Sequence, residues 1–410
     1  MEASDDVTRT DYKWRLQENV ISDDDLERLV DFIRTTKRFT QFTKVREFEE
    51  AFAAWQGCKY CVMVNSGSSA NLVAVAAAKE LHGWAHGAEV LVPAVTWPTT
   101  VTPVMQLGLK PVFVDVNLRD LSFDYEALES SITSRSVAIF VPHLLGFPAD
   151  VRRLTGICRK HDLVLLEDCC ESQGANADGL KVGRHGLAGT FSFYWGHHMT
   201  TVEGGMLCTD DRNVYETALL KRSHGLAREL PSDRHEELAA ANAGIDFRFL
   251  FLTDGFNVRN TEFNAVLGLA QLASLDEFIR IRNRNYVRFL EICSPFEDEL
   301  ILLRGSGVSS FVLPFIFRSS QHKAAFEELL GSEGIESRPL ISGNLLRQPV
   351  FARFGAPAAF PVADLLHTNA FYIGNNQFVG EERLALLEGL IQRFFSELQP
   401  RRRESPVSPT

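Results

Sequence analysis

The sequence predicts an α/β protein in which a large domain with a mainly parallel sheet precedes a smaller α+β domain. Short β-rich runs alternate with helical stretches from residue 60 to residue 169, and a long helical pattern over 261–293 separates them from a mixed C-terminal part. We therefore expect a large domain at 1–275 with an N-terminal helical arm, a small domain at 276–400 and a disordered tail at 401–410.

Local patterns predict the individual elements in order along the chain. Ser22 precedes apolar residues at helical spacing, which indicates a capped helix, and a second amphipathic helix covers 45–55. Strands are predicted from the runs YCVMV, EVLVP, PVFVDV, SVAIFVPH, LVLLEDC, GTFSFYW, GGMLCT and SSFVLPFIF, and a final helix from 379–397.

Composition and charge exclude several classes of protein. The 410 residues are 45% hydrophobic and 23% charged, which suffices for a large core without a disulfide or metal. A net charge of −11 argues against nucleic-acid or anionic-membrane partners, and no apolar run is long enough to span a membrane. The acidic N-terminus lacks the features of a secretory signal, and seven irregularly spaced cysteines indicate reduced thiols. We expect a cytoplasmic enzyme.

The segment Asn65–Asn71 is the first candidate for a ligand site. It follows a predicted strand and begins a helix, where Gly67 permits a tight turn and the amides of Ser68 and Ser69 would point outward. Phosphate binds well at such a helix N-terminus. The same residues can also form an ordinary strand-to-helix turn with a serine cap.

A second candidate is the carboxylate run that ends the strand LVLLEDC. Asp168 stands at the carboxyl end of this strand, where open α/β sheets collect their ligands, and Glu171 follows three residues later. A carboxylate here can bond a protonated heterocyclic nitrogen. A helix cap or a metal ligand is the alternative.

The third motif, 190–205, makes the resemblance specific. Together with VTWPTT at 95–100 and GFNVRNTEFNAVLGLAQL at 255–272, it resembles the DegT/DnrJ/EryC1/StrS aminotransferase superfamily of fold-type I enzymes dependent on pyridoxal phosphate (PLP). The resemblance implies a seven-stranded sheet and a homodimer whose subunits share active sites. It implies that Gly67, Ser68, Ser69 and Ser192 hold the cofactor phosphate, Trp97 stacks on the ring, Asp168 pairs with the ring nitrogen, Glu171 approaches the phenolic oxygen and Asn257 reaches the partner's phosphate. Trp97 as a core residue and Asn257 as a helix cap are the simpler interpretations.

The sequence departs from the superfamily at one position. Aminotransferases of this kind carry a lysine six residues before the Glu-Gly-Gly signature, and counting back from Glu203 gives His197. Histidine forms no Schiff base but moves protons near neutral pH. The resemblance then implies the sugar 3-dehydratases, which work with pyridoxamine phosphate (PMP). A drifted residue in an inactive relative is the alternative, and we expect His198 to be a packing residue.

The remaining assignments follow from the dehydratase branch. Without a plausible four-cysteine set we expect no iron–sulfur cluster and no metal. The segments SFYWGHHMTTVEGGM and KRSHGLARE resemble the cluster-free branch, which uses glutamate and acts on GDP-4-keto-6-deoxy-D-mannose in colitose biosynthesis. The substrate-site candidates are His224, Arg228, Arg338 and Asn344, although Arg228 also fits a solvated helix face. A sugar aminotransferase and a non-catalytic ligand-binding relative remain alternatives.

Overall fold

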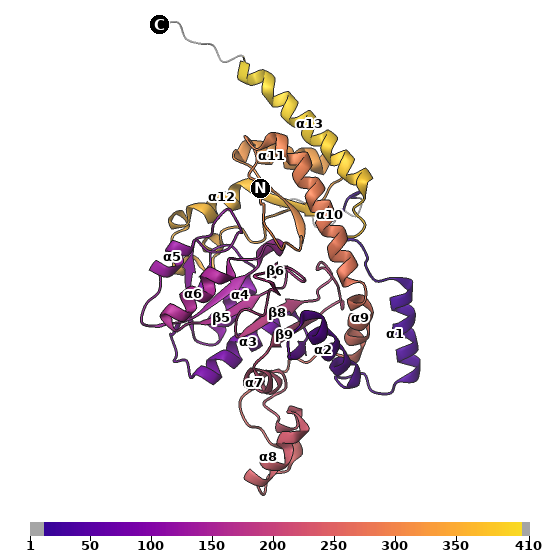
Figure 1. Cartoon of the computed structure of the whole chain (residues 1–410), viewed down its shortest axis with the longest axis vertical. Coiled ribbons are helices and arrows are strands. Elements are labelled where there is room, and N and C mark those ends of the chain that lie inside the picture. Colours follow the sequence, from indigo (N-terminus) through magenta and orange to yellow (C-terminus); the bar gives the residue numbers. More distant parts are fainter. Residues whose placement is uncertain (1–11, 404–410) are drawn as a thin grey trace.

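The computed structural model describes residues 12–403, which form a large α/β layer structure with a smaller sheet-and-helix part beside it (Figure 1). The helices are α1 Asp23–Thr35, α2 Thr43–Gln56, α3 Gly67–His82, α4 Pro98–Gln106, α5 Tyr125–Ser130, α6 Val151–His161, α7 Arg212–Arg222, α8 His235–Ala241, α9 Glu262–Leu272, α10 Leu275–Cys293, α11 Ser320–Ser332, α12 Pro361–Asn369 and α13 Glu381–Arg403. The strands are β1 Tyr60–Val64, β2 Glu89–Pro93, β3 Lys110–Val114, β4 Ser136–Pro142, β5 Val164–Asp168, β6 Asn176–Ala177, β7 Leu180–Lys181, β8 Ala188–Ser192, β9 Gly205–Thr209, β10 Val312–Ile316, β11 Ser337–Pro339 and β12 Ala370–Gly374.

The large sheet has seven strands in the order β1-β9-β8-β5-β4-β2-β3. All neighbouring pairs are parallel except those of β9, which runs antiparallel to both β1 and β8. The predicted mainly parallel seven-stranded sheet is therefore confirmed. Because the six parallel strands share one direction, the loops that follow them meet at a single edge of the sheet.

Helices cover both faces of this sheet, as the apolar strand runs predicted. Alternate residues of β1 enter different cores: Val62 and Val64 pack in the core that contains α3, α4 and α7, whereas Cys61 and Met63 pack in the core that contains α2 and α9. Helices α5 and α6 cover the β2–β4–β5 part of the second face. Side chains of successive strand residues point to opposite faces, so the pattern follows directly from strand geometry.

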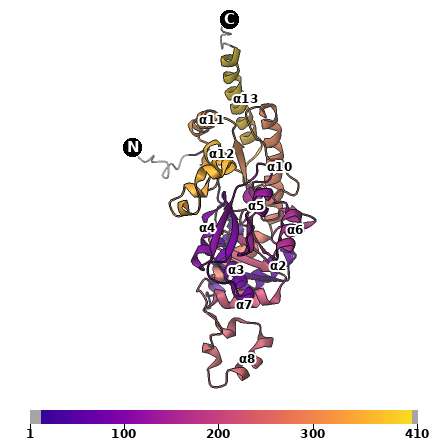
Figure 2. The ribbon, with the colours of Figure 1, turned by 90° about the vertical axis from the view of Figure 1, so that its left-hand side faces the viewer.

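The smaller part contains the antiparallel sheet β10-β12-β11. The N-terminal segment joins it: Trp14 is buried there, its indole donates to the carbonyl of Gly374 at 3.0 Å, and its backbone pairs with Ile335. Figures 1 and 2 show α13 extending away from this part, while the segment around α8 projects from the opposite end of the molecule beyond α7 (Figure 2).

Several element predictions are confirmed and two are adjusted. Ser22 caps α1 as predicted, and Asp25 completes a capping box. The helix predicted over 261–293 is two helices, α9 and α10, interrupted at Ala273 and Ser274. The predicted tail starts too early, since α13 continues to Arg403; its remainder, 404–410, and the first eleven residues lie outside the described residues. The division at 275/276 stays a prediction. No helix within 12–403 is long and apolar enough to cross a membrane.

Candidate active site

The carboxyl edge of the large sheet gathers most of the residues predicted to hold a cofactor. The loops after β1 and β2 carry the α3 turn and Trp97 to this edge, and Asp168 and Ser192 end β5 and β8 there. Four segments distant in sequence thus meet where an open α/β sheet binds ligands.

The turn that begins α3 packs tightly against the end of β8. Ser66 is the N-cap, and its hydroxyl accepts a hydrogen bond from the amide of Ser69 at 3.1 Å. The Ser69 amide therefore does not point outward as predicted, because it donates to the hydroxyl of the N-cap residue. Gly67 has no left-handed backbone; it is glycine because a Cβ there would lie 2.5 Å from Cβ of Ser192. The reason for glycine at position 67 is therefore the close approach of Ser192 and not the predicted tight turn.

Asp168 is held in place by three donors. One carboxylate oxygen accepts from the side chains of Asn71 and Thr100, both at 2.8 Å, and the other accepts from the amide of Cys170 at 3.1 Å. Asn71 and Thr100 were missed in the sequence, although Asn71 ends the first candidate segment and Thr100 lies in the motif at 95–100. The metal-ligand and helix-cap interpretations of Asp168 lose support, since the donors fix its carboxylate as a hydrogen-bond acceptor aimed at the sheet edge.

The neighbouring Glu167 points the other way, into a closed network. Its carboxylate accepts from the amides of Gly183, His185 and Gly186 and lies 3.0 Å from Nε2 of His143. The amide of Ala149 donates to Nδ1 of His143, so Nε2 carries the proton. These groups have no free lone pair to offer a metal ion, and the network instead fixes the end of β5 behind Asp168.

Glu171 lies on the same loop and keeps a proton unusually well. Its carboxylate accepts from the amide of Leu145 at 2.8 Å. Burial raises the pKa of Glu171 to about 8, and the nearby charge of Asp168 adds to this increase. Glu171 is therefore available near neutral pH as a proton donor or acceptor at the site.

Trp97 and Ser192 flank this loop. Trp97 forms the N-cap of α4 and is 55% exposed, so the alternative of a core tryptophan is wrong. Ser192 ends β8 beside Gly67, with its side chain largely buried. An exposed indole offers a stacking face to a flat ring, and a serine beside a helix start offers a hydroxyl to a phosphate.

The two adjacent histidines have different hydrogen-bond partners, although both rings lie near Phe311. The imidazole of His197 lies within hydrogen-bonding reach of the Cys170 backbone and stacks on Phe311, with ring centroids 5.3 Å apart. Its Nδ1 has no partner among residues 12–403. His198 is fully buried, and its Nε2 lies 3.2 Å from both the carbonyl and the hydroxyl of Ser309. His198 is thus a packing residue, whereas His197 lies against the loop after β5.

Arg282 of α10 supports this arrangement and was not predicted. Its buried guanidinium donates to the carbonyls of Phe311, Asn375 and, at 3.3 Å, His197. Burial and, to a smaller extent, the positive charge of Arg282 together lower the pKa of His197 to about 4. The imidazole is consequently neutral at pH 7 and able to accept a proton.

The flanking lysines do not replace the missing amine. The ammonium of Lys181 lies over the ring of Trp55, 3.6 Å from its centroid. Lys221 is buried and pairs with Glu80 at 2.5 Å and Asp254 at 2.6 Å. Both charges have partners away from the loop that carries Asp168.

Asn257 and His224 lie together at the rim beside the α3 turn. Ser223 and Asn257 form a β-bridge, and the next residue, Val258, accepts from the amide of Asn65 at 2.9 Å. Asn257 does not cap α9, whose N-cap is Thr261. Both Asn257 and His224 are exposed, and His224 has a left-handed backbone with φ +59°.

The remaining substrate-site candidates, Arg228, Arg338 and Asn344, differ in exposure and in hydrogen-bond partners. Arg228 lies exposed on a short 3₁₀ turn, and its guanidinium donates to the carbonyl of Arg248 at 3.1 Å. Asn344 is 0% exposed, caps the turn Leu345–Arg347 and donates to Asp364 at 2.8 Å. Its assignment as a substrate contact is therefore corrected to a structural cap.

Arg338 is better placed than Asn344. It is exposed on β11 directly opposite Tyr372 of β12. Burial raises the pKa of Tyr372 to about 12; the charge of Glu171 raises it too, and that of Arg338 opposes this increase. Tyr372, which the sequence did not single out, thus lies close both to Glu171 of the loop after β5 and to Arg338. It is the residue of the small sheet that comes near the candidate site.

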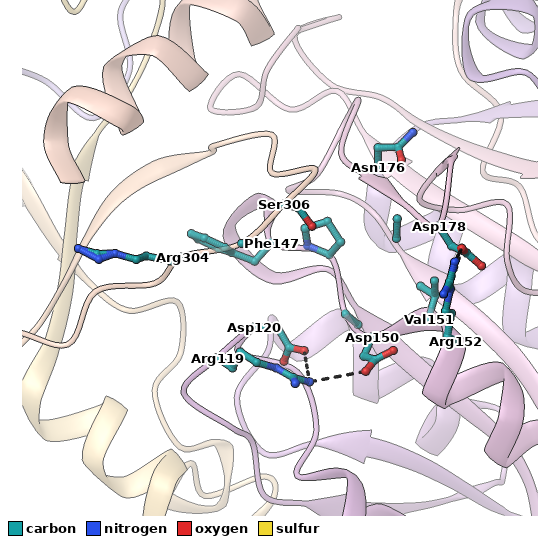
Figure 3. A pocket seen from close by; sticks show the side chains of 14 residues that line it. Arg119, Asp120, Phe147, Asp150, Val151, Arg152, Asn176, Asp178, Arg304 and Ser306 are labelled. Atoms are coloured by element: carbon teal, nitrogen blue, oxygen red, sulfur yellow. Dashed lines mark hydrogen bonds and ion pairs between the residues drawn. The ribbon is translucent and has the colours of Figure 1, made fainter. Parts of the chain in front are cut away.

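A separate pocket of about 340 Å³ contains none of the predicted residues (Figure 3). Its charged groups pair with one another: Arg119 contacts Asp120 and Asp150 at 3.6 and 3.7 Å, and Arg152 pairs with Asp178. Because these charges are compensated, the pocket offers little net field to a ligand.

Comparisons with known proteins agree with this geometry. Residues 20–385 match the sequence profile of the DegT/DnrJ/EryC1/StrS aminotransferase family. A GDP-4-keto-6-deoxy-D-mannose 3-dehydratase of Yersinia pseudotuberculosis is 36% identical over 378 residues, covering 90% of this chain and 94% of that protein. An Escherichia coli O55:H7 protein of the same name is 37% identical over 365 residues, covering 86% and 93%.

Solved structures extend the likeness to three dimensions. A GDP-4-keto-6-deoxymannose-3-dehydratase with bound GDP-perosamine is 33% identical with a TM-score of 0.86, covering 92% of this chain and 100% of that chain. Another structure of such a dehydratase, with a trapped PLP-glutamate geminal diamine, is 32% identical with a TM-score of 0.84, at 92% and 100% coverage. By its sequence, its fold and the residues at its sheet edge, the chain belongs to the DegT/DnrJ/EryC1/StrS aminotransferase family.

Proposed function

We propose that the protein is a PLP/PMP-dependent nucleotide-sugar 3-dehydratase. It removes the 3-hydroxyl of a 4-keto-6-deoxyhexose, with GDP-4-keto-6-deoxy-D-mannose as the favoured substrate and glutamate as the amino donor, in cytoplasmic deoxysugar biosynthesis. The observation that carries the proposal is His197, a neutral imidazole with an unpartnered nitrogen at the place where an aminotransferase needs a lysine. A family relative named as a GDP-4-keto-6-deoxy-D-mannose 3-dehydratase supports the choice of sugar.

The residues at the sheet edge fit a pyridoxal cofactor. The close approach of Gly67 to Ser192 forms a cradle that a Cβ would fill, and Ser68 and Ser192 offer hydroxyls there for a phosphate. The exposed ring of Trp97 offers a stacking face, and the Asp168 carboxylate ends β5 with its orientation fixed by Asn71 and Thr100. When bound, PMP supplies an amine for a sugar ketone and a ring that stores electrons.

The chain's own groups then have distinct tasks. His197 accepts a proton at its free ring nitrogen, because its lowered pKa keeps it neutral. Asp168 keeps a ring nitrogen protonated by offering a fixed carboxylate. Glu171, protonated more readily than an ordinary glutamate, holds or returns a proton near the leaving hydroxyl or the cofactor oxygen.

A homodimer with shared sites belongs to the same proposal. Asn257 and His224 are exposed beside the α3 turn, where a partner subunit can reach them; Oδ1 of Asn257 accepts from Nε of Arg259 at 3.1 Å. The projecting segment around α8 exposes Ile245, Phe249 and Phe251, three large apolar side chains that a second copy would cover (Figure 1). His224, Arg228 and Arg338 remain the proposed substrate contacts.

The aminotransferase alternative is tested by cofactor attachment. We expect PLP to be removed by dialysis and borohydride to leave no covalent adduct on any lysine. Addition of glutamate to the PLP-loaded protein should convert the aldehyde absorbance band into the PMP band. A stable reduced adduct on a lysine, found by mass spectrometry, would show an aminotransferase-like attachment and contradict the proposal.

His197→Lys is the matched comparison for this test. It restores an amine at the predicted position, so borohydride should now fix the cofactor at residue 197 while dehydration is lost. A dehydrating wild type that releases ammonia, beside a non-dehydrating His197→Lys variant with fixed cofactor, is the expected pair of results. Failure of the wild type to convert PLP with glutamate would favour the non-catalytic alternative.

A further inference from the structure

Three cysteine thiols converge at the edge of the large sheet opposite the candidate active site. Cys58 follows the end of α2, Cys61 lies on β1, and Cys208 lies on β9 directly opposite Cys61. The sulfur atoms of Cys58 and Cys61 are 3.6 Å apart, those of Cys61 and Cys208 are 3.1 Å apart, and all three lie within 4.8 Å of one another. All three thiols are free.

This geometry is close to that of a thiolate metal site. Zinc–sulfur bonds of about 2.3 Å at tetrahedral angles place sulfurs roughly 3.8 Å apart. The Cys58–Cys61 distance already agrees with this value, and the Cys61–Cys208 distance needs to open by about 0.7 Å, within reach of side-chain rotation. Cys58 and Cys61 also have the two-residue spacing that structural zinc sites use.

The surroundings leave one side of the cluster open. Cys58 is only partly buried, so a cation and a water can reach it. Asp210 also lies close, but it accepts from the amide of Lys59 at 2.7 Å and pairs with Arg184.

We propose that Cys58, Cys61 and Cys208 form a binding site for one zinc ion, with the fourth position open to water. Such an ion ties the end of α2 to β1 and β9. From Cys61 to the end of β1 the chain advances three residues, or about 10 Å at 3.3 Å per residue, so the ion is separate from the carboxyl edge of the sheet. The site is independent of the proposed dehydratase activity, and strand pairing across 147 residues explains why the sequence spacing alone predicted no metal.

The alternative use of these thiols is a Cys61–Cys208 disulfide, because paired strand positions are within bridging reach. The third sulfur argues for the metal site, since a disulfide consumes two thiols and leaves Cys58 with no role. In the other group of potential ligands, His143, Glu167 and Cys169, the acceptor atoms of Glu167 and His143 are already used by each other and by backbone amides.

Cobalt and zinc titrations of the full chain test the proposal. After reduction and removal of metal with a chelator, we expect one equivalent of Co²⁺ to produce tetrahedral d–d bands in the red region, where the cofactor does not absorb. Zn²⁺ should displace the cobalt. Cys58→Ser should abolish the bands and weaken Zn²⁺ binding by at least the roughly 10- to 100-fold that loss of an outer partner costs.

Cys158→Ser is the matched control, because Cys158 is a buried thiol of α6 outside the cluster. It should keep the bands and the one-to-one stoichiometry. Alkylation of Cys58, mapped by mass spectrometry, should slow when Zn²⁺ is present, which gives a second measurement if Cys208→Ser fails to fold. Binding that is absent in the wild type or equally lost in Cys158→Ser would overturn the proposal, as would a Cys61–Cys208 disulfide that persists in protein isolated under metal-replete conditions.

Discussion

The two sides of the turn between β8 and β9 carry the same side chain with opposite surroundings. On one side, His197 faces the loop after β5 with a ring nitrogen left free. On the other side, His198 is buried against the segment before β10 and bonds to Ser309. The Nδ1 atoms of both imidazoles are without a partner among residues 12–403, so a free nitrogen does not distinguish them. Burial and neighbours do, since His197 is half-buried beside the Cys170 backbone and His198 is fully buried against Ser309. The comparison teaches that surroundings mark a functional side chain better than residue type does.

Replacing each imidazole in turn is the strongest test of whether the two histidines have different roles. We expect His197→Asn to bind PMP and sugar yet lose dehydration by about 10²–10⁴-fold, because an amide cannot accept the proton that a neutral imidazole takes. Product formation and deuterium exchange at the cofactor and sugar positions measure the loss. His198→Asn should retain most of the rate.

The opposite result would reassign the base. If the His198 variant is inactive while the His197 variant still dehydrates, the imidazole that serves the reaction is the buried one, and the turn must rearrange when substrate binds. Retained PMP binding in both variants, measured by absorbance after gel filtration, separates loss of chemistry from loss of the cofactor.

A second prediction concerns Asp168, the second of the two adjacent carboxylates that end β5. Asp168→Asn should lower the glutamate half-reaction by roughly 10- to 150-fold, the equivalent of about 1.5–3 kcal/mol for one charge-assisted hydrogen bond. The side chain keeps its size and two of its three donors can adapt, so the fold should survive. Stopped-flow absorbance of the PLP-to-PMP conversion measures the effect, and near wild-type rates would show that Asp168 only supports the structure.

The sequence predicted the positions on this edge but not the contacts between them. Strand and helix periodicity placed Asp168, Ser192 and the α3 turn at strand ends, and the common strand direction brought them together. The reason for Gly67 was missed because the close approach of Ser192 comes from a strand 125 residues later in the chain. Arg282 and Tyr372 were missed for the same physical reason: their contacts exist only after the small domain packs on the large one.

Asn344 shows the converse error. Its segment resembled a substrate loop, but its side chain is consumed by a local cap and by Asp364. Short polar side chains bond nearby backbone more often than ligands, and sequence alone does not tell the two uses apart. His197 was singled out because a missing lysine is a chemical signal that needs no structure, and its catalytic role stays a prediction.

A third prediction concerns stability rather than rate. His198→Asn should lower the free energy of unfolding by about 1–3 kcal/mol, because the buried hydrogen bonds to Ser309 and the packing on Phe311 are lost. His197→Asn should cost less, since the side chain it replaces is less buried and lacks the bonds to Ser309. Urea unfolding of both variants at neutral pH gives the comparison, and equal losses would contradict the asymmetry of the turn.

The smallest expected effect is a change in the pH dependence of stability, and it tests whether both imidazoles are neutral in the folded protein. Burial lowers the pKa of His197 to about 4 and that of His198 well below its usual value. The unfolded chain takes up these protons near its ordinary pKa of about 6.5, so it binds more protons than the folded protein between pH 6.5 and 4, and stability falls as pH falls. Each histidine should contribute about 1 kcal/mol of loss between pH 7 and pH 5.5. Glu171 acts in the opposite direction, because its raised pKa makes the folded state bind the extra proton below pH 8.

The measurement is therefore a difference in the free energy of unfolding between two pH values. Cofactor-free wild type, His197→Asn and His198→Asn are unfolded in urea at pH 7 and at pH 5.5. Each variant should lose about 1 kcal/mol less stability on acidification than the wild type, since the Glu171 contribution cancels. An unchanged pH dependence in the His197 variant would mean that His197 titrates normally in the folded chain, and its neutral state at pH 7 would then owe nothing to burial or to Arg282.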